Sequence, residues 1–201
     1  MKILCFGDSN TYGYDPRSYW ASRYPSDSRW VDLLARKLDC EAVNEGENGR
    51  EIPCREDQKT TFRRMLADRM PVDLLIVMLG TNDLLQGNDT ETVVRRMECF
   101  LESIPLDNCK ILLIGPPPMR PGEWVSGQGL IASSIALNRE LRTLSERLGT
   151  GFADAGEWNI PLAFDGVHFT EKGHNVFADR LAEIIAAINV CEFTDCNRRL
   201  T

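Results

Sequence analysis

The sequence predicts an α/β protein, a three-layer α/β/α sandwich with a five-stranded parallel sheet at its centre. Short apolar runs of strand length alternate along the chain with longer segments whose apolar residues recur every three or four positions. Two of the short runs are apolar throughout, which is typical of strands buried on both faces. Regular alternation of strands and helices favours a parallel sheet that helices cover on both sides.

The five expected strands lie at 3–6, 42–43, 74–79, 111–114 and 152–153. The third and fourth are the most apolar, and the fifth is the weakest. A turn that contains glycine follows each of the first four, and an aspartate follows the fifth. Such turns indicate where each strand ends.

Four segments between the strands have the apolar spacing of amphipathic helices. Their apolar residues are Trp30, Leu33, Leu34 and Leu38; Val93, Val94, Met97, Phe100 and Leu101; Leu137, Leu141, Leu144 and Leu148; and Phe177, Leu181, Ile184, Ile185 and Ile188. The Pro- and Gly-rich segment 116–129 is expected to be a surface loop near the strand ends. We therefore expect a single domain over 1–201, with a core of about 1–188 and a polar tail at 189–201.

Length and charge limit the possible functions. A chain of 201 residues is long enough to bury one substantial core. A formal net charge of −7 and a pI of about 5.0 argue against nucleic acid or an anionic membrane surface as a partner. Since no stretch approaches the ~20 apolar residues of a membrane span, we expect no membrane association.

The cysteines and glycine motifs indicate neither a metal nor a cofactor. The 7 cysteines form no Cys-x-x-Cys pair, and the only histidines are His168 and His174. We interpret the cysteines as reduced thiols, mostly in the core, of a cytoplasmic protein. The Gly-x-Gly-x-x-Ala match at 127–132 follows a Pro-rich loop instead of a strand, so we reject a dinucleotide site there.

Four polar clusters follow the predicted strands, where parallel sheets bind their ligands. The first, Gly7-Asp8-Ser9-Asn10, places a serine on a tight turn between strand and helix. There Ser9 could serve as a nucleophile, with its own backbone N–H directed into the site. The alternative is that Asp8 and Ser9 only begin a helix.

The second and third clusters each allow two interpretations. The second, at 44–50, contains Gly49, which can bring a backbone N–H close to a ligand or can simply form a turn. The third, Gly80-Thr81-Asn82-Asp83, offers the Asn82 amide as a donor to an oxyanion, or as a cap for the next helix. Neither cluster decides between its interpretations alone.

The fourth cluster supplies a base. His168 follows Asp165 by three residues, a spacing that can bring both side chains to the same side of a turn. A neutral imidazole can activate a serine, and a carboxylate fixes its tautomer and stabilises the imidazolium. His174 lies in 170–174, which has the pattern of a capped helix start. We therefore favour His168 over His174 as the base.

In their order and spacing, the four clusters resemble the conserved blocks of the SGNH (GDSL-like) hydrolases. These blocks are Gly-Asp-Ser at 7–9, Gly49, Gly-Thr-Asn-Asp at 80–83 and Asp-x-x-His at 165–168. The resemblance covers 3–185 and is strongest to the branch that contains arylesterases and acyltransferases. The segments that carry the resemblance most clearly are 3–14, 23–25, 29–30, 44–46, 48–50, 78–83 and 165–171.

The resemblance implies the flavodoxin-like fold of these hydrolases and a serine esterase activity. Ser9 would be the nucleophile, His168 the base and Asp165 its orienting carboxylate. The oxyanion hole would combine the backbone N–H groups of Ser9 and Gly49 with the Asn82 side-chain amide. The partner would be a small-molecule ester, hydrolysed through an acyl-enzyme or passed to an alcohol, with no metal or cofactor. The resemblance is also compatible with a homo-oligomer.

The sequence departs from that branch beside the second block. Glu47 stands where relatives usually have an apolar residue before Asn48. Glu51-Ile52-Pro53 follows Arg50, where relatives usually have two threonines. Substrate preference is therefore open, and a carbohydrate O-acetylesterase with the same triad is an alternative. A non-catalytic binding module of the same fold is a further alternative, which turnover of an aryl acetate would exclude.

Overall fold

The computed structural model describes residues 1–18, 20, 22–105 and 110–198, with 189–198 described by their backbone alone. Its sheet is parallel, in the order β2-β1-β3-β4-β5. The strands are β1 (Lys2–Gly7), β2 (Glu41–Gly46), β3 (Leu74–Met78), β4 (Lys110–Gly115) and β5 (Gly151–Asp154). The chain leaves β1 for β2 on one side and then crosses to β3 on the other, which creates a crevice at the carboxyl end of β1. The predicted five-stranded parallel sheet is confirmed.

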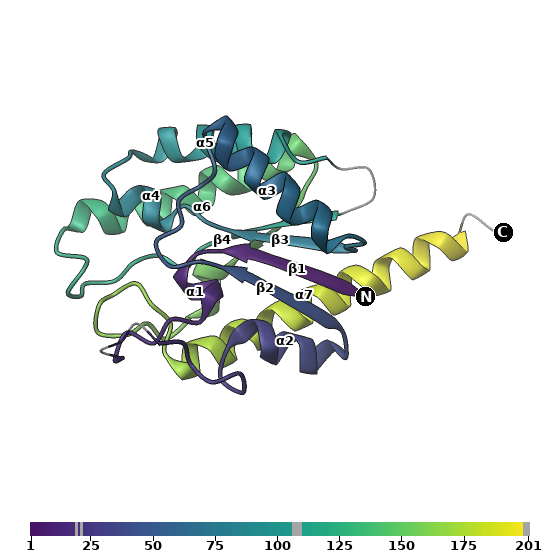
Figure 1. Cartoon of the computed structure of the whole chain (residues 1–201), viewed down its shortest axis with the longest axis horizontal. Coiled ribbons are helices and arrows are strands. Elements are labelled where there is room, and N and C mark those ends of the chain that lie inside the picture. Colours follow the sequence, from purple (N-terminus) through teal and green to yellow (C-terminus); the bar gives the residue numbers. More distant parts are fainter. Residues whose placement is uncertain (19, 21, 106–109, 199–201) are drawn as a thin grey trace.

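Helices cover both faces of this sheet (Figure 1). One face carries α3 (Glu56–Arg69), α5 (Thr90–Glu102) and α6 (Gln128–Leu148), and the other carries α2 (Trp30–Leu38) and α7 (Glu171–Arg198). Three short helices directly follow strands: α1 (Ser9–Tyr12), α4 (Thr81–Leu85) and the 3₁₀ helix η1 (Ala155–Trp158). These short helices place their first residues at the carboxyl edge of the sheet.

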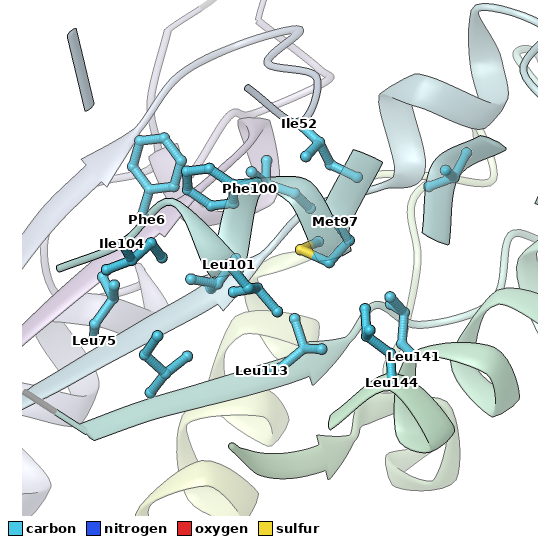
Figure 2. Packing of buried hydrophobic residues seen from close by; sticks show 14 of the residues in the cluster. Phe6, Ile52, Leu75, Met97, Phe100, Leu101, Ile104, Leu113, Leu141 and Leu144 are labelled. Carbon is cyan, nitrogen blue, oxygen red and sulfur yellow. The ribbon is translucent and has the colours of Figure 1, made fainter. Parts of the chain in front are cut away.

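The core forms two layers because strand side chains alternate between the faces. Phe6 and Leu113 point toward α5 and α6, where Figure 2 shows them with Met97, Phe100 and Leu144. The opposite layer collects the other apolar strand residues with those of α2 and α7, namely Ile3, Cys5, Trp30, Leu34, Ile76, Met78, Leu112, Ile114, Phe177, Leu181 and Ile185. Burial on both faces explains the continuous apolar runs of β3 and β4.

Two helices differ from the sequence-based expectation. The apolar spacing did not predict α3, because only Phe62 and Leu66 of this helix are buried and most of its other residues are polar. The last helix, α7, continues past Ile188 to Arg198, through most of the segment expected to be a polar tail. Figure 1 shows this end of α7 projecting beyond the other elements. Among the described residues, none of the helices has the length and apolarity to cross a membrane.

The expectation that the thiols lie mostly in the core is wrong for the cysteines whose side chains are described. All four are free; Cys5 is buried and Cys40 is partly buried, whereas Cys54 and Cys99 are exposed. Cys54 lies in the connection between β2 and α3, and Cys99 lies on α5 between positions whose side chains face the core. Cys109 and the side chains of Cys191 and Cys196 lie outside the described part of the chain.

Candidate active site

Ser9, His168 and Asp165 meet at the carboxyl end of β1. Ser9 is the first residue of α1, while Asp165 and His168 lie in the loop between η1 and α7. Ser9 Oγ lies 2.9 Å from His168 Nε2, and His168 Nδ1 lies 2.7 Å from Asp165 Oδ2. The three residues are 6%, 2% and 1% exposed, respectively. Segments far apart in the sequence thus form one continuous chain of hydroxyl, imidazole and carboxylate.

The loop that carries Asp165 is fixed by its own backbone. Asp165 Oδ1 accepts hydrogen bonds from the N–H groups of Val167 and His168, both at 2.9 Å. Gly166 has a φ of +82°, and a Cβ there would lie 2.1 Å from the Arg120 carbonyl oxygen, so only glycine fits. Burial raises the pKa of Asp165, but the hydrogen bonds from His168 and Val167 outweigh it and hold that pKa below its ordinary value. Asp165 therefore stays a carboxylate.

The capping and catalytic interpretations of the first cluster are compatible. Asp8 is the N-cap of α1, where its side chain accepts the Asn10 N–H at 2.9 Å. Its carboxyl group is buried, and desolvation raises its pKa to about 6. Because the cap fixes the start of α1, it also fixes the direction in which Ser9 presents its hydroxyl.

Asn10 joins α1 to the loop that carries the imidazole. Its Oδ1 accepts the Phe169 N–H at 2.8 Å, and its Nδ2 donates to the Val167 carbonyl oxygen at 3.2 Å. The Trp30 indole N–H donates to the Asn10 carbonyl oxygen at 3.0 Å. Asn10 thus holds Ser9 and His168 in register, a role that the sequence analysis missed. Its one signal in the sequence was its place directly after Ser9.

Gly49 and Asn82, the other residues expected at the oxyanion hole, lie on neighbouring segments. Gly49 has a φ of +73°, and apart from Gly49 itself and its two chain neighbours no residue has an atom within 4 Å of where its Cβ would be. The N-cap of α4 is Gly80, so the helix-capping interpretation of Asn82 is wrong. Instead, Asn82 Nδ2 donates to the Arg50 carbonyl oxygen at 3.0 Å, which leaves its second N–H for another acceptor.

Arg50 holds the loop that contains Gly49. Its Nη1 donates to the Gly7 carbonyl oxygen at 2.8 Å and also to the Glu45 carbonyl oxygen. Its Nη2 bonds to Glu47 at 2.7 Å, and its guanidinium lies 4.2 Å from the centre of the Phe6 ring. These contacts tie the loop to the ends of β1 and β2. No motif in the sequence indicated this role of Arg50.

His174 takes no part in this arrangement. It is fully buried, its Nδ1 accepts the Trp30 N–H at 3.4 Å, and its Nε2 has no hydrogen-bond partner. Burial lowers its pKa to about 3, so the ring is neutral at physiological pH. The structure places His168 and not His174 against Ser9. Within the described residues, no group of three or more His, Cys, Asp or Glu side chains is arranged to hold a metal ion.

Two aromatic rings flank the His168 imidazole. The ring centres of Tyr14 and Trp124 lie 4.6 and 4.8 Å from that of His168. The Tyr14 N–H donates to the Ser9 carbonyl oxygen at 3.0 Å, and the Trp124 N–H donates to the Asp165 carbonyl oxygen at 3.1 Å. Trp124 is 51% exposed and lies in the Pro-rich loop. The loop was expected near the strand ends, but nothing in its composition indicated a contact with the imidazole.

Residues 5–176 match the GDSL-like Lipase/Acylhydrolase family, a span that includes all four polar clusters. The chain belongs to this family. As a GDSL-like hydrolase it is a serine hydrolase of carboxylic esters, in keeping with its Ser-His-Asp arrangement.

Other GDSL-like and esterase structures are similar over almost the whole chain. The aryl esterase of M. smegmatis is 28% identical, with a TM-score of 0.82 over 92% of this chain and 98% of that one. A carbohydrate acetylesterase from Sinorhizobium meliloti is 26% identical, with a TM-score of 0.81 over 93% and 99%. A GDSL lipase from Mycobacterium tuberculosis is 26% identical over 199 residues, which cover 92% of this chain and 81% of the relative.

Proposed function

We propose that this GDSL-like hydrolase cleaves small carboxylic esters through an acyl-enzyme. Ser9 Oγ attacks the ester carbonyl carbon while His168 Nε2 takes the hydroxyl proton, and Asp165 stabilises the imidazolium. His168 then gives the proton to the departing alkoxide. Water, or an alcohol in a transfer reaction, releases the acyl group by the same steps. The observation that carries the proposal is the 2.9 Å and 2.7 Å hydrogen-bond chain from Ser9 through His168 to Asp165.

The negative charge that develops on the carbonyl oxygen is stabilised by three donors. We assign them as the backbone N–H groups of Ser9 and Gly49 and the Asn82 side-chain amide. The position of Ser9 at the start of α1, the open face of Gly49 and the second N–H of Asn82 support this assignment.

Turnover of p-nitrophenyl acetate tests the proposal. Ser9→Ala is expected to lower kcat by about 10⁴-fold or more, because the nucleophile and base act as a unit. A fluorophosphonate probe is expected to label Ser9. Ser145→Ala is the control, since Ser145 is also buried but bonds to the Thr150 carbonyl oxygen at the far end of α6. Retained turnover in Ser9→Ala, or labelling of another residue, would contradict the proposal.

A carbohydrate O-acetylesterase is the second candidate. A cavity of about 560 Å³ adjoins Gly49, and its lining includes both apolar side chains and carboxylates able to accept hydrogen bonds from sugar hydroxyls. It is lined by Phe6, Glu45, Glu47, Gly49, Arg50, Glu51, Pro53, Asp57, Gln58, Thr61, Phe62 and Met65. Higher kcat/KM for an acetylated monosaccharide than for phenyl acetate would favour this candidate. Turnover of neither ester would contradict both candidates.

A further inference from the structure

Two of the three proposed oxyanion donors, Gly49 and Asn82, follow strands that do not pair with each other. Gly49 follows β2 and Asn82 follows β3, and these strands lie on opposite sides of β1. Two hydrogen bonds join the segments directly. Asn82 Nδ2 donates to the Arg50 carbonyl oxygen at 3.0 Å, and the Ile52 N–H donates to Asp83 Oδ2 at 3.0 Å.

A cation from a third element completes this connection. Asp83 is fully buried, and its Oδ1 accepts a hydrogen bond from Arg96 Nη1 on α5 at 2.8 Å. The same Nη1 lies 3.0 Å from Glu51 Oε2. Arg96 therefore bridges one carboxylate on α4 and one on the loop that follows β2. Burial raises the pKa of Asp83, and the Arg96 guanidinium opposes this effect.

We propose that Arg96 is a positioning residue of the oxyanion hole. Through Asp83 and Glu51 it fixes the spacing between the Gly49 N–H and the Asn82 amide, without touching the substrate itself. This inference rests on the proposed function. Oxyanion donors stabilise the transition state only when they are held in place before the reaction, and misplacement by about 1 Å can cost about 10²-fold in rate.

Loss of the guanidinium has a defined consequence. An unpaired buried carboxylate is strongly disfavoured, so Asp83 would take up a proton or turn away from its site. Either change weakens its hydrogen bond to the Ile52 N–H. The loop then loses two of its contacts with α4 and α5, those through Ile52 and Glu51, and the Gly49 N–H is no longer fixed relative to Asn82.

The test compares Arg96→Met with Arg95→Met. Arg95 is the neighbouring arginine on α5, and its contacts are with Glu91 and Thr92 at the surface. With p-nitrophenyl acetate, Arg96→Met is expected to lower kcat about 10- to 100-fold at unchanged KM, and Arg95→Met to leave both unchanged. A trifluoromethyl ketone, which forms an oxyanion on Ser9, should bind Arg96→Met more weakly by a similar factor. Arg96→Lys should recover part of the rate.

The outcomes distinguish failure of this inference from failure of the proposed function. If wild type turns over the ester and the two arginine variants have the same kcat, the inference is overturned and the proposed function stays intact. A rise in KM alone, or a rate loss that matches the fraction unfolded in a thermal melt, also overturns it. If Arg96→Met does not fold, Glu51→Gln takes its place, because this variant keeps the Asp83–Arg96 pair. It is expected to lower kcat several-fold at constant KM. An unchanged kcat overturns the inference. Absence of turnover and of Ser9 labelling in wild type refutes the proposed function instead.

Discussion

Replacing Asp165 by asparagine separates the orientation of His168 from its basicity. The new Oδ1 can keep the hydrogen bonds that Asp165 Oδ1 accepts from the Val167 and His168 N–H groups. The new amide N–H₂ then faces His168 Nδ1, which must become an acceptor. The ring proton moves to Nε2, and the atom that lies 2.9 Å from Ser9 Oγ can no longer take the serine proton.

The expected loss of kcat in Asp165→Asn is about 10⁴-fold, or about 5.5 kcal/mol in the activation barrier. The loss of stability should be far smaller, about 1–2 kcal/mol, because one charge-assisted hydrogen bond becomes a neutral one while the two backbone bonds stay. Steady-state turnover of p-nitrophenyl acetate and thermal melts on the same preparations measure the two quantities. The ratio between them identifies a catalytic defect rather than an unfolded protein.

Asp154→Asn is the matched control for this substitution. Asp154 also caps a turn, since its Oδ1 accepts the Gly156 N–H at 2.9 Å, but its carboxylate faces Asn138 and Arg142. We expect its kcat to stay close to that of wild type. A folded Asp165→Asn variant with kcat within tenfold of wild type would refute the assignment of Asp165 as the residue that orients His168.

Two further substitutions test other parts of the site. Asn82→Ala is expected to lower kcat by about 10²–10³-fold with little change in KM, while thermal melts record only about 1 kcal/mol for the lost bond to Arg50. A variant that melts early but turns over normally would remove Asn82 from the oxyanion hole. For His174, the folded-state pKa of about 3 lies below the ordinary 6.5, so stability present above pH 6.5 is lost as the pH falls toward 3. Urea unfolding measures the free energy of unfolding at about pH 7 and about pH 5. Between these two values wild type should lose about 2 kcal/mol more of this free energy than His174→Gln loses. Equal losses in the two proteins would show that His174 does not cause the pH dependence.

The sequence allowed the strands and the triad residues to be predicted because each has a strong local pattern. Continuous apolar runs such as that of β3 are typical of strands buried on both faces, and the two core layers show that β3 is buried in this way. The triad positions followed from a resemblance in which Gly-Asp-Ser and Asp-x-x-His occur in the expected order. The structure brings Ser9, His168 and Asp165 together as that resemblance implies.

Features that depend on contacts between distant segments could not be predicted in this way. The helix α3 buries only Phe62 and Leu66, too few for a recognisable apolar stripe. Asn10 and Arg50 act through backbone groups of other segments, and no residue type marks such a partner in a single sequence. Trp124 reaches His168 because the Pro-rich loop folds back over the site, whereas its composition indicated only an irregular segment.

Tyr14 and Trp124, whose rings lie beside His168, are hydrogen-bonded to the catalytic residues through their main-chain N–H groups. The Tyr14 and Trp124 N–H groups bond to the carbonyl oxygens of Ser9 and Asp165, and every amino acid except proline has such an N–H. Exchange of either side chain therefore reshapes the walls around the imidazole while the anchoring hydrogen bonds persist. The main chain of Tyr14 and Trp124 thus supports the catalytic geometry, while their side chains shape the surroundings of the imidazole. Selection can therefore alter these surroundings without rebuilding the triad.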